Sequence, residues 1–124
     1  MRIIHTGDAP AAIGPYSQAV IAKGLCFCSG QIGMDPETGE MVLGGVEAQT
    51  HRAILNLSAV LQEAGSSLNH VVKVTVYLKD MGDFSTMNSV YEQFFNAHRP
   101  ARAAVEVARL PKDALVELDA IAVV

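Results

Sequence analysis

Arg102 is the residue of this sequence whose chemistry most needs a partner. It lies in RPARAAVEV (residues 99–107), at the start of an otherwise apolar stretch with the spacing of a β-strand. A guanidinium carries five N–H donors in a planar fork and stays charged in proteins, so a strand that surrounds it also needs an anion. A protein carboxylate or a bound anionic ligand can fill that need, and the sequence leaves both open.

Glu117 is the carboxylate that the neighbouring segment offers. It lies in LVELDAIAV (residues 115–123), on the same strand face as Asp119. If residues 102–107 and 115–123 form an antiparallel hairpin around ARLPKD, a register that pairs residue 107 with residue 112 sets Arg102 opposite Glu117. The two side chains are then either a structural salt bridge or two parts of one binding site.

Two further stretches place polar groups near the ends of strands. AAIGPYSQAV puts Tyr16 directly after a Gly-Pro turn, and CSGQIG puts Ser29 and Gly30 at the end of a strand, where backbone N–H groups can be left free for an anion. SGQIG lacks the further Gly and the Lys of a nucleotide-binding loop. Taken singly such residues are usually structural, and their joint occurrence at loop ends makes them candidates.

Cys26 and Cys28 are the only cysteines and lie two apart in LCFCSG. On a strand both thiols share a face, with Cα atoms roughly 7 Å apart, at the edge of disulfide reach. None of the four histidines has metal-ligand spacing toward them. We expect buried, reduced cysteines, as in cytosolic proteins, and no metal site.

The elements that position these residues follow from the spacing of apolar side chains. Helical spacing predicts one helix over 46–64, ended by Gly65, and a second that starts at an Asp83 N-cap and stops before Pro100. Alternation in HVVKVTVYLKD predicts a strand whose inward face carries Val72, Val74, Val76 and Leu78. Further strands are predicted at Arg2–His5, Ser17–Ala22, Leu25–Ser29, Arg102–Val107 and Leu115–Val123.

This element order predicts the fold class. Three strands, a helix, a strand, a helix and two strands indicate one α+β domain over 1–124, a single mixed sheet of about six strands with both helices on one face. The other face of the central strand carries Val71, Lys73, Thr75 and Tyr77. That mixture is too polar for a dry core and too apolar for open water, so we expect it to line a subunit contact.

Composition narrows the class of partner. Half of the residues are hydrophobic and 18% are charged, below the roughly 25% of an average soluble domain, which favours a homo-oligomer. A net charge of -4 and the lack of a basic, aromatic-studded run argue against nucleic-acid binding. No signal-like or membrane-spanning apolar stretch is present, so we expect a cytoplasmic protein without a membrane partner.

Four stretches together resemble a known family. GPYSQAV (14–20), SGQIGMDPETGE (29–40), VVKVTVYLKDMGDFSTMNSVYEQFF (71–95) and PARAAVEVARLPKDALVELDAIAV (100–123) are similar to the Rid, or YjgF, family of enamine/imine deaminases. The similarity runs from about residue 8 to residue 123. It includes the family's C-terminal signature, from Pro-x-Arg to Val-Glu.

The resemblance implies a fold, an assembly and roles for the site residues. The family fold resembles a small chorismate mutase and assembles as a homotrimer with clefts between subunits, without metal or cofactor. Arg102 would hold the carboxylate of a 2-imino or 2-keto acid, and Glu117 would orient or activate the attacking water. Ser29 and Gly30 would lie along the substrate, Tyr16 would contribute its hydroxyl or ring, and Asn88 would close the cleft from a neighbouring subunit.

The implied activity is that of a 2-iminobutanoate/2-iminopropanoate deaminase, which hydrolyses 2-aminoacrylate-type enamines, as imines, to 2-keto acids and ammonia. A protonated imine carbon is already electrophilic, so positioning by Arg102 and a water held by Glu117 are enough. A nearby Arg102 would lower the proton affinity of Glu117, which favours water positioning over deprotonation.

Two departures from the family pattern leave the substrate open. Arg99 stands where many members have an aromatic residue before the proline, and Ala104 stands where many have a cysteine. The stretch from Phe95 to Pro100 is also shorter. A larger substrate such as 2-aminomuconate, with Arg99 on a second carboxylate, is one alternative. A non-catalytic 2-keto-acid-binding regulatory trimer and an endoribonuclease are the others, and the acidic net charge weighs against the last.

Overall fold

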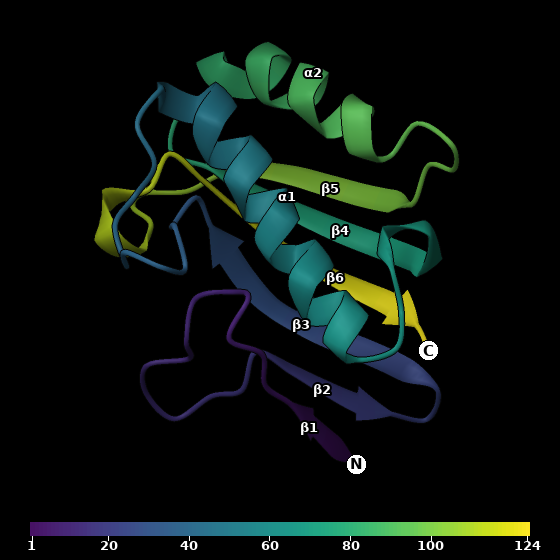
Figure 1. Cartoon of the computed structure of the whole chain (residues 1–124). Helices are drawn as coiled ribbons and strands as arrows, with labels where there is room; N and C mark the ends of the chain where they lie inside the picture. Colours follow the sequence, from purple (N-terminus) through teal and green to yellow (C-terminus); the bar gives the residue numbers. More distant parts are fainter.

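In the computed structural model, which describes residues 1–124, the chain folds into a six-stranded mixed sheet with both α-helices on one face (Figure 1). The strand order is β1-β2-β3-β6-β4-β5, and the α+β class predicted from the sequence is confirmed. The helices are α1 (Gly45–Glu63) and α2 (Phe84–Phe94), with three short 3-10 turns at Leu68–His70, Met81–Asp83 and Pro111–Asp113. The strands are β1 (Arg2–Ile4), β2 (Ala19–Ala22), β3 (Leu25–Ile32), β4 (Val71–Leu78), β5 (Ala101–Glu106) and β6 (Val116–Val123).

The predicted hairpin between the last two strands is wrong. β5 pairs in parallel with β4, and β6 lies antiparallel between β3 and β4, so β4 separates β5 from β6. Arg102 is in register with Val74, and Glu117 is in register with Tyr77. β4, α2 and β5 form a βαβ crossover, in which the helix returns the chain to the end of the sheet where β4 began, so β5 runs parallel to β4. β5 therefore occupies the free edge of β4 and does not pair with β6.

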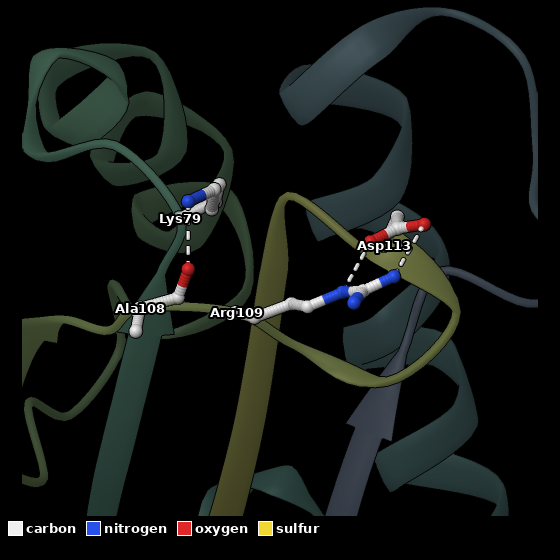
Figure 2. Close-up of polar contacts among 4 residues, drawn as sticks. All are labelled: Lys79, Ala108, Arg109 and Asp113. Atoms are coloured by element: carbon white, nitrogen blue, oxygen red, sulfur yellow. Dashed lines mark hydrogen bonds and ion pairs between the residues drawn. The ribbon is translucent and has the colours of Figure 1, made fainter.

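The loop after β5 carries the chain across the end of β4 to reach β6. Figure 2 shows its polar contacts: Lys79 Nζ donates to the Ala108 carbonyl at 2.7 Å, and Arg109 donates to both carboxylate oxygens of Asp113, at 2.8 and 3.3 Å. Lys112 and Asp113 both have positive φ, near 55°, so the chain turns sharply here. The turn predicted at ARLPKD is therefore present, but it joins strands that are not neighbours.

The core lies between the helices and the sheet. Val74, Val76 and Leu78 are fully buried on the helix side, as predicted. Val71 and Val72 have the reverse of the predicted faces, because the β4–β6 register shifts between Val71 and Lys73 and the alternation slips there. α1 ends one residue before the predicted 46–64, and Gly65 follows it with a φ of 81°.

Cys26 and Cys28 face the core from β3. Both are buried and free, and their Sγ atoms are 3.8 Å apart. No group of three or more His, Cys, Asp or Glu side chains in the structure, including these two cysteines, is placed to hold a metal ion. Neither helix combines the length and the apolar character needed to span a bilayer.

Candidate active site

Arg102 reaches the helix side of the sheet from the edge strand β5. Its register partner Val74 is buried beneath the helices, and paired residues of adjacent strands share a face. The Arg102 Nη1 donates to Asn88 Oδ1 at 2.7 Å, and its Cζ lies 4.7 Å from the ring centroid of Tyr91 and 5.5 Å from that of Phe84. The guanidinium is thus held in place by one amide and two rings.

No carboxylate of the chain neutralises Arg102. The single salt bridge in the structure joins Arg109 to Asp113 and does not involve Arg102. Only one of the five N–H donors of Arg102 has a protein acceptor. A fixed guanidinium with free donors is suited to a bidentate contact with a carboxylate from outside the chain.

A cleft of about 400 Å³ opens beside this guanidinium. Residues of α2, of the segment that follows it and of β5 line the cleft, namely Asn88, Tyr91, Glu92, Phe95, Arg99, Pro100 and Arg102. Asn88 contacts Arg102 of its own chain, and its closing of a cleft against a neighbouring subunit stays a prediction. The α2 turn that faces β5 places Asn88 and Tyr91, three residues apart, on one side of the helix.

Glu117 lies in a second cleft, on the opposite face of the sheet. Val116 and Leu118 point into the core, so Glu117 between them points away from the helices. This cleft, of about 430 Å³, brings Glu117 together with Tyr16 and Gly30. The sequence predicted these three residues as members of one site, and the structure gathers them in one place.

Gly30 lets the Glu117 side chain lie against β3. A Cβ built at Gly30 would overlap Glu117 Oε2 and would lie 2.8 Å from its Cδ. The bulge between Cys28 and Gln31 brings this glycine across from β6. Only a residue without a side chain leaves room for the carboxylate in this position.

With Glu117 in the catalytic role that the resemblance implies, Gly30→Ala should damage activity much more than stability. The atoms that must move belong to the end of a flexible side chain, so we expect a loss of less than about 1 kcal/mol in unfolding free energy. A displaced Glu117 should lower kcat by about 100-fold, because small misplacements of positioning groups are that damaging. Steady-state kinetics and thermal denaturation check this, with Gly7→Ala as control because a Cβ there meets nothing within 4 Å. Wild-type kcat in Gly30→Ala would contradict the placement of Glu117.

Burial raises the pKa of Glu117 above its ordinary value, and the negative charge of Asp119 on the same strand face raises it further. Asp119 accepts a hydrogen bond from the Tyr77 hydroxyl at 2.9 Å, which holds it beside Glu117. Arg102 is not among the groups that shift Glu117. The expectation that Arg102 lowers the proton affinity of Glu117 is therefore wrong for the single chain, because the sheet separates the two.

Three buried amides hold the segments around the Glu117 cleft, and the sequence did not predict a role for them. Gln18 accepts from Thr6 N at 2.7 Å and donates to the Pro10 carbonyl at 2.8 Å, so it fixes the loop that leads to Tyr16. Gln49 Oε1 accepts from Leu115 N, just before β6. Asn56 donates to two carbonyls that follow the β3 bulge. The sequence could have indicated the two amides on α1. Gln49 lies four residues before Ala53 and Asn56 lies three residues after it, so both are polar residues on an otherwise apolar helix face.

Ser29 stands apart from both clefts. Its hydroxyl donates to the Ser17 carbonyl at 2.6 Å, and its backbone N donates to the Gln18 carbonyl at 2.9 Å. It lines neither cleft. These contacts tie β3 to the segment that carries Tyr16, and a direct contact of Ser29 with substrate stays a prediction.

Tyr91 carries the one buried side-chain polar atom without a hydrogen-bond partner, its hydroxyl oxygen. A buried unsatisfied hydroxyl destabilises the fold by about 1–3 kcal/mol. Tyr91→Phe keeps the ring beneath Arg102, so we expect the free energy of unfolding to rise by about 1 kcal/mol, measured by chemical denaturation. Tyr77→Phe is the control, because the Tyr77 hydroxyl has a partner and its loss should not stabilise the protein. A less stable Tyr91→Phe would contradict the orphaned hydroxyl.

The comparisons with known proteins agree with one another. The family model described as Endoribonuclease L-PSP matches residues 6–124. A RutC family protein of Pyrococcus abyssi is 58% identical over 121 residues, which cover 98% of this chain and 95% of that protein. The chain belongs to the Rid family. The resemblance predicted from the sequence is thus confirmed.

Named Rid relatives include an enzyme and a ligand complex. The 2-iminobutanoate/2-iminopropanoate deaminase of Bos taurus is 52% identical over 122 residues, covering 98% of this chain and 89% of that one. The crystal structure of E. coli TdcF with bound serine superimposes with a TM-score of 0.95 at 45% identity, covering 100% of this chain and 99% of that one. The YjgF gene product of E. coli has a TM-score of 0.94 at 47% identity, covering 99% and 98%.

Proposed function

We propose that this Rid protein is a deaminase that hydrolyses 2-aminoacrylate-type enamines, in their imine form, to 2-keto acids and ammonia. The observation that carries the proposal is the Arg102 guanidinium, which Asn88 and Tyr91 hold in a cleft and no carboxylate neutralises. The bovine relative's name states such an activity. The serine in TdcF shows that a relative holds a small molecule with the carboxylate and nitrogen pattern of this substrate class.

We propose further that the working site forms between copies of the chain in a homotrimer. Arg102 and Glu117 lie on opposite faces of the sheet with β4 between them, so one small substrate cannot contact both within one chain. The open face carries apolar side chains such as Phe27 and Val105, which are 44% and 41% exposed. These are large for a water-facing surface, and burial of this face against a neighbour explains them.

In this site the substrate carboxylate takes the free N–H donors of Arg102, which fixes the plane of the 2-imino acid. Glu117 of the adjoining copy holds the attacking water. Water adds to the protonated C=N carbon and loses a proton to Glu117, giving a carbinolamine. Glu117 returns that proton to the nitrogen, and the C–N bond breaks to release ammonia. Glu117 then takes the hydroxyl proton of the former carbinolamine and passes it to ammonia, so the 2-keto acid and ammonium leave. Burial and Asp119 raise the pKa of Glu117 within one chain, and a raised pKa suits two-way proton transfer better than that of a free carboxylate.

Glu117 should carry a cost in stability that its neutral counterpart lacks. Since the pKa of Glu117 in the folded protein is raised, the protonated carboxyl favours the folded state. This stabilisation is present below the ordinary pKa of a glutamate and is lost as pH rises through the raised pKa, so the ionised carboxylate destabilises the fold at pH 7. We therefore expect Glu117→Gln to have a higher Tm than wild type at pH 7 and a smaller difference at pH 4. Scanning calorimetry at the two pH values measures this, with the exposed Glu63→Gln as control. A lower Tm for Glu117→Gln at pH 7 would contradict the raised pKa.

The direct test of the function is the release of 2-keto acid and ammonia when a pyridoxal-phosphate dehydratase generates 2-aminoacrylate in the same tube. We expect the protein, in amounts far below the substrate, to speed both releases equally, and expect Glu117→Gln to abolish the effect. No acceleration by wild type would overturn the proposal. If 2-ketobutyrate still bound through Arg102, the regulatory trimer would be the better reading.

The endoribonuclease in the family model's name finds less support. The net charge is -4, and the free cations Arg99 and Arg102 share their cleft with Glu92 rather than forming a broad basic surface. A cytoplasmic location also belongs to the proposal, supported by the two free thiols of Cys26 and Cys28.

A further inference from the structure

The Arg102 cleft contains a second guanidinium that the proposed reaction does not use. Arg99 lines the same cleft, and neither arginine forms a salt bridge in the chain. One carboxylate of a small 2-imino acid can occupy Arg102 alone. The donors of Arg99 are then left facing a site that has already bound its minimal substrate.

The side chains that one chain places around the cleft are mainly positive. Arg99 and Arg102 bring two positive charges, and Glu92 is the only acidic residue that lines the cleft. In the proposed trimer Glu117 of the adjoining copy holds the attacking water at the imine carbon. A distal carboxylate of the substrate would therefore be the natural partner of Arg99.

Pro100 limits the backbone conformation of Arg99. The residue before a proline is restricted to extended backbone, so the exposed Arg99 side chain leaves the chain in a limited range of directions, and Pro100 itself forms part of the cleft wall. The Cα atoms of residues 99 and 102 are at most about 10 Å apart along an extended chain. Two arginine side chains from these positions can converge on the two ends of a short dicarboxylate.

The size of the cleft agrees with this. Its volume of about 400 Å³ falls in the range of small-molecule sites, roughly 300–1,000 Å³. A three- or four-carbon acid on Arg102 fills only part of that space. A chain one or two carbons longer, ending in a carboxylate, has room to extend within the cleft that Arg99 also lines.

We propose that Arg99 is a specificity-determining residue that binds a second carboxylate, and that the preferred substrates are 2-imino acids with a carboxylate at the end of a short side chain. The proposal rests on the proposed deaminase function and names the substrate class of that same site. Arg99 contacts the distal group and takes no part in the proton transfers. Glu92 opposes it, so its removal should tighten dicarboxylate binding.

The test is isothermal titration calorimetry of the full-length protein with two matched keto acids. 2-Oxoglutarate carries the distal carboxylate, and its 5-methyl ester has the same chain with a neutral ester there. We expect wild type to bind 2-oxoglutarate about tenfold more tightly than the ester, the usual size of a charge-assisted contact. Arg99→Gln should remove this difference without changing the affinity for the ester, and Glu92→Gln should enlarge it. Arg109→Gln, which removes the same charge from a loop outside the cleft, should behave as wild type.

The outcomes separate the two proposals. Equal affinities for the two ligands in wild type, or equal losses for both in Arg99→Gln, would overturn the role of Arg99. If binding of both ligands also survived Arg102→Ala, the carboxylate site itself would be wrong and the proposed function would fail with it. If wild type bound both ligands equally and Arg102→Ala bound neither, only the proposed preference for dicarboxylates would be overturned, and the carboxylate site at Arg102 would stand. Imine hydrolysis with a dicarboxylic and a monocarboxylic amino acid as precursors should show the same order in kcat/KM.

Discussion

Arg102→Ala should lower kcat/KM for 2-imino acid hydrolysis by about 100- to 10,000-fold. Hydrogen bonds to charged groups contribute about 1.5–3 kcal/mol each, and a bidentate contact adds two of them. Each 1.36 kcal/mol corresponds to about a tenfold change in rate. Because Arg102 fixes the plane of the substrate as well as its position, both kcat and KM should suffer. Keto-acid release followed over a range of enzyme and precursor concentrations measures the loss.

Arg102→Lys separates charge from geometry. It keeps the positive charge but offers no planar fork and stacks less well on the Tyr91 ring, so we expect it to recover only a small part of the activity. The Arg102 side chain is exposed, and its removal should shift Tm by no more than a few degrees. An Arg102→Ala protein with more than about a tenth of wild-type kcat/KM, or an Arg102→Lys protein with full activity, would contradict the bidentate contact.

The elements of the fold were predictable because they depend on local spacing. Apolar residues at helical spacing gave α1 within two residues, and alternation gave the interior of β4. The order of strands was missed because pairing depends on contacts between distant segments. The ARLPKD turn predicted a hairpin of β5 with β6. Instead, the crossover through α2 places β5 beside β4, and β6 pairs with β3. Val71 and Val72 were assigned to the wrong faces because no local signal marks a register shift.

The site was predictable in part for the same reason. The residue types of Arg102 and Glu117 and the family motifs marked them, and Tyr16 and Gly30 do lie beside Glu117. Their distribution over two faces was not predictable, because it follows from β4 lying between β5 and β6. The contact of Asn88 with Arg102 also needed the structure, since it depends on how α2 packs over β5. Sequence motifs name the groups, and the topology decides which of them meet within one chain.

Mixing two inactive proteins should restore activity, because the proposed site takes Arg102 from one copy and Glu117 from the next. Arg102→Ala and Glu117→Gln should each be nearly inactive alone. In randomly mixed trimers from equal amounts, a site is intact when its Arg102 comes from a Glu117→Gln chain and its Glu117 from an Arg102→Ala chain. Each choice has a probability of one half, so about one quarter of wild-type activity should return. Unfolding and refolding the mixture together, then measuring keto-acid release, gives this number.

The result depends on topology and not on the strength of any contact. A site built within one chain gives no restoration at any mixing ratio, since every chain of the mixture lacks one of the two groups. The double variant Arg102→Ala/Glu117→Gln mixed with wild type is the matched control. There too a site is intact only when both of its chains are wild type, so a shared site again leaves about one quarter of the activity of an all-wild-type sample of the same total concentration, whereas a single-chain site leaves about one half. The pair of fractions therefore reports whether β4 divides the two groups in the working enzyme as it does in the chain.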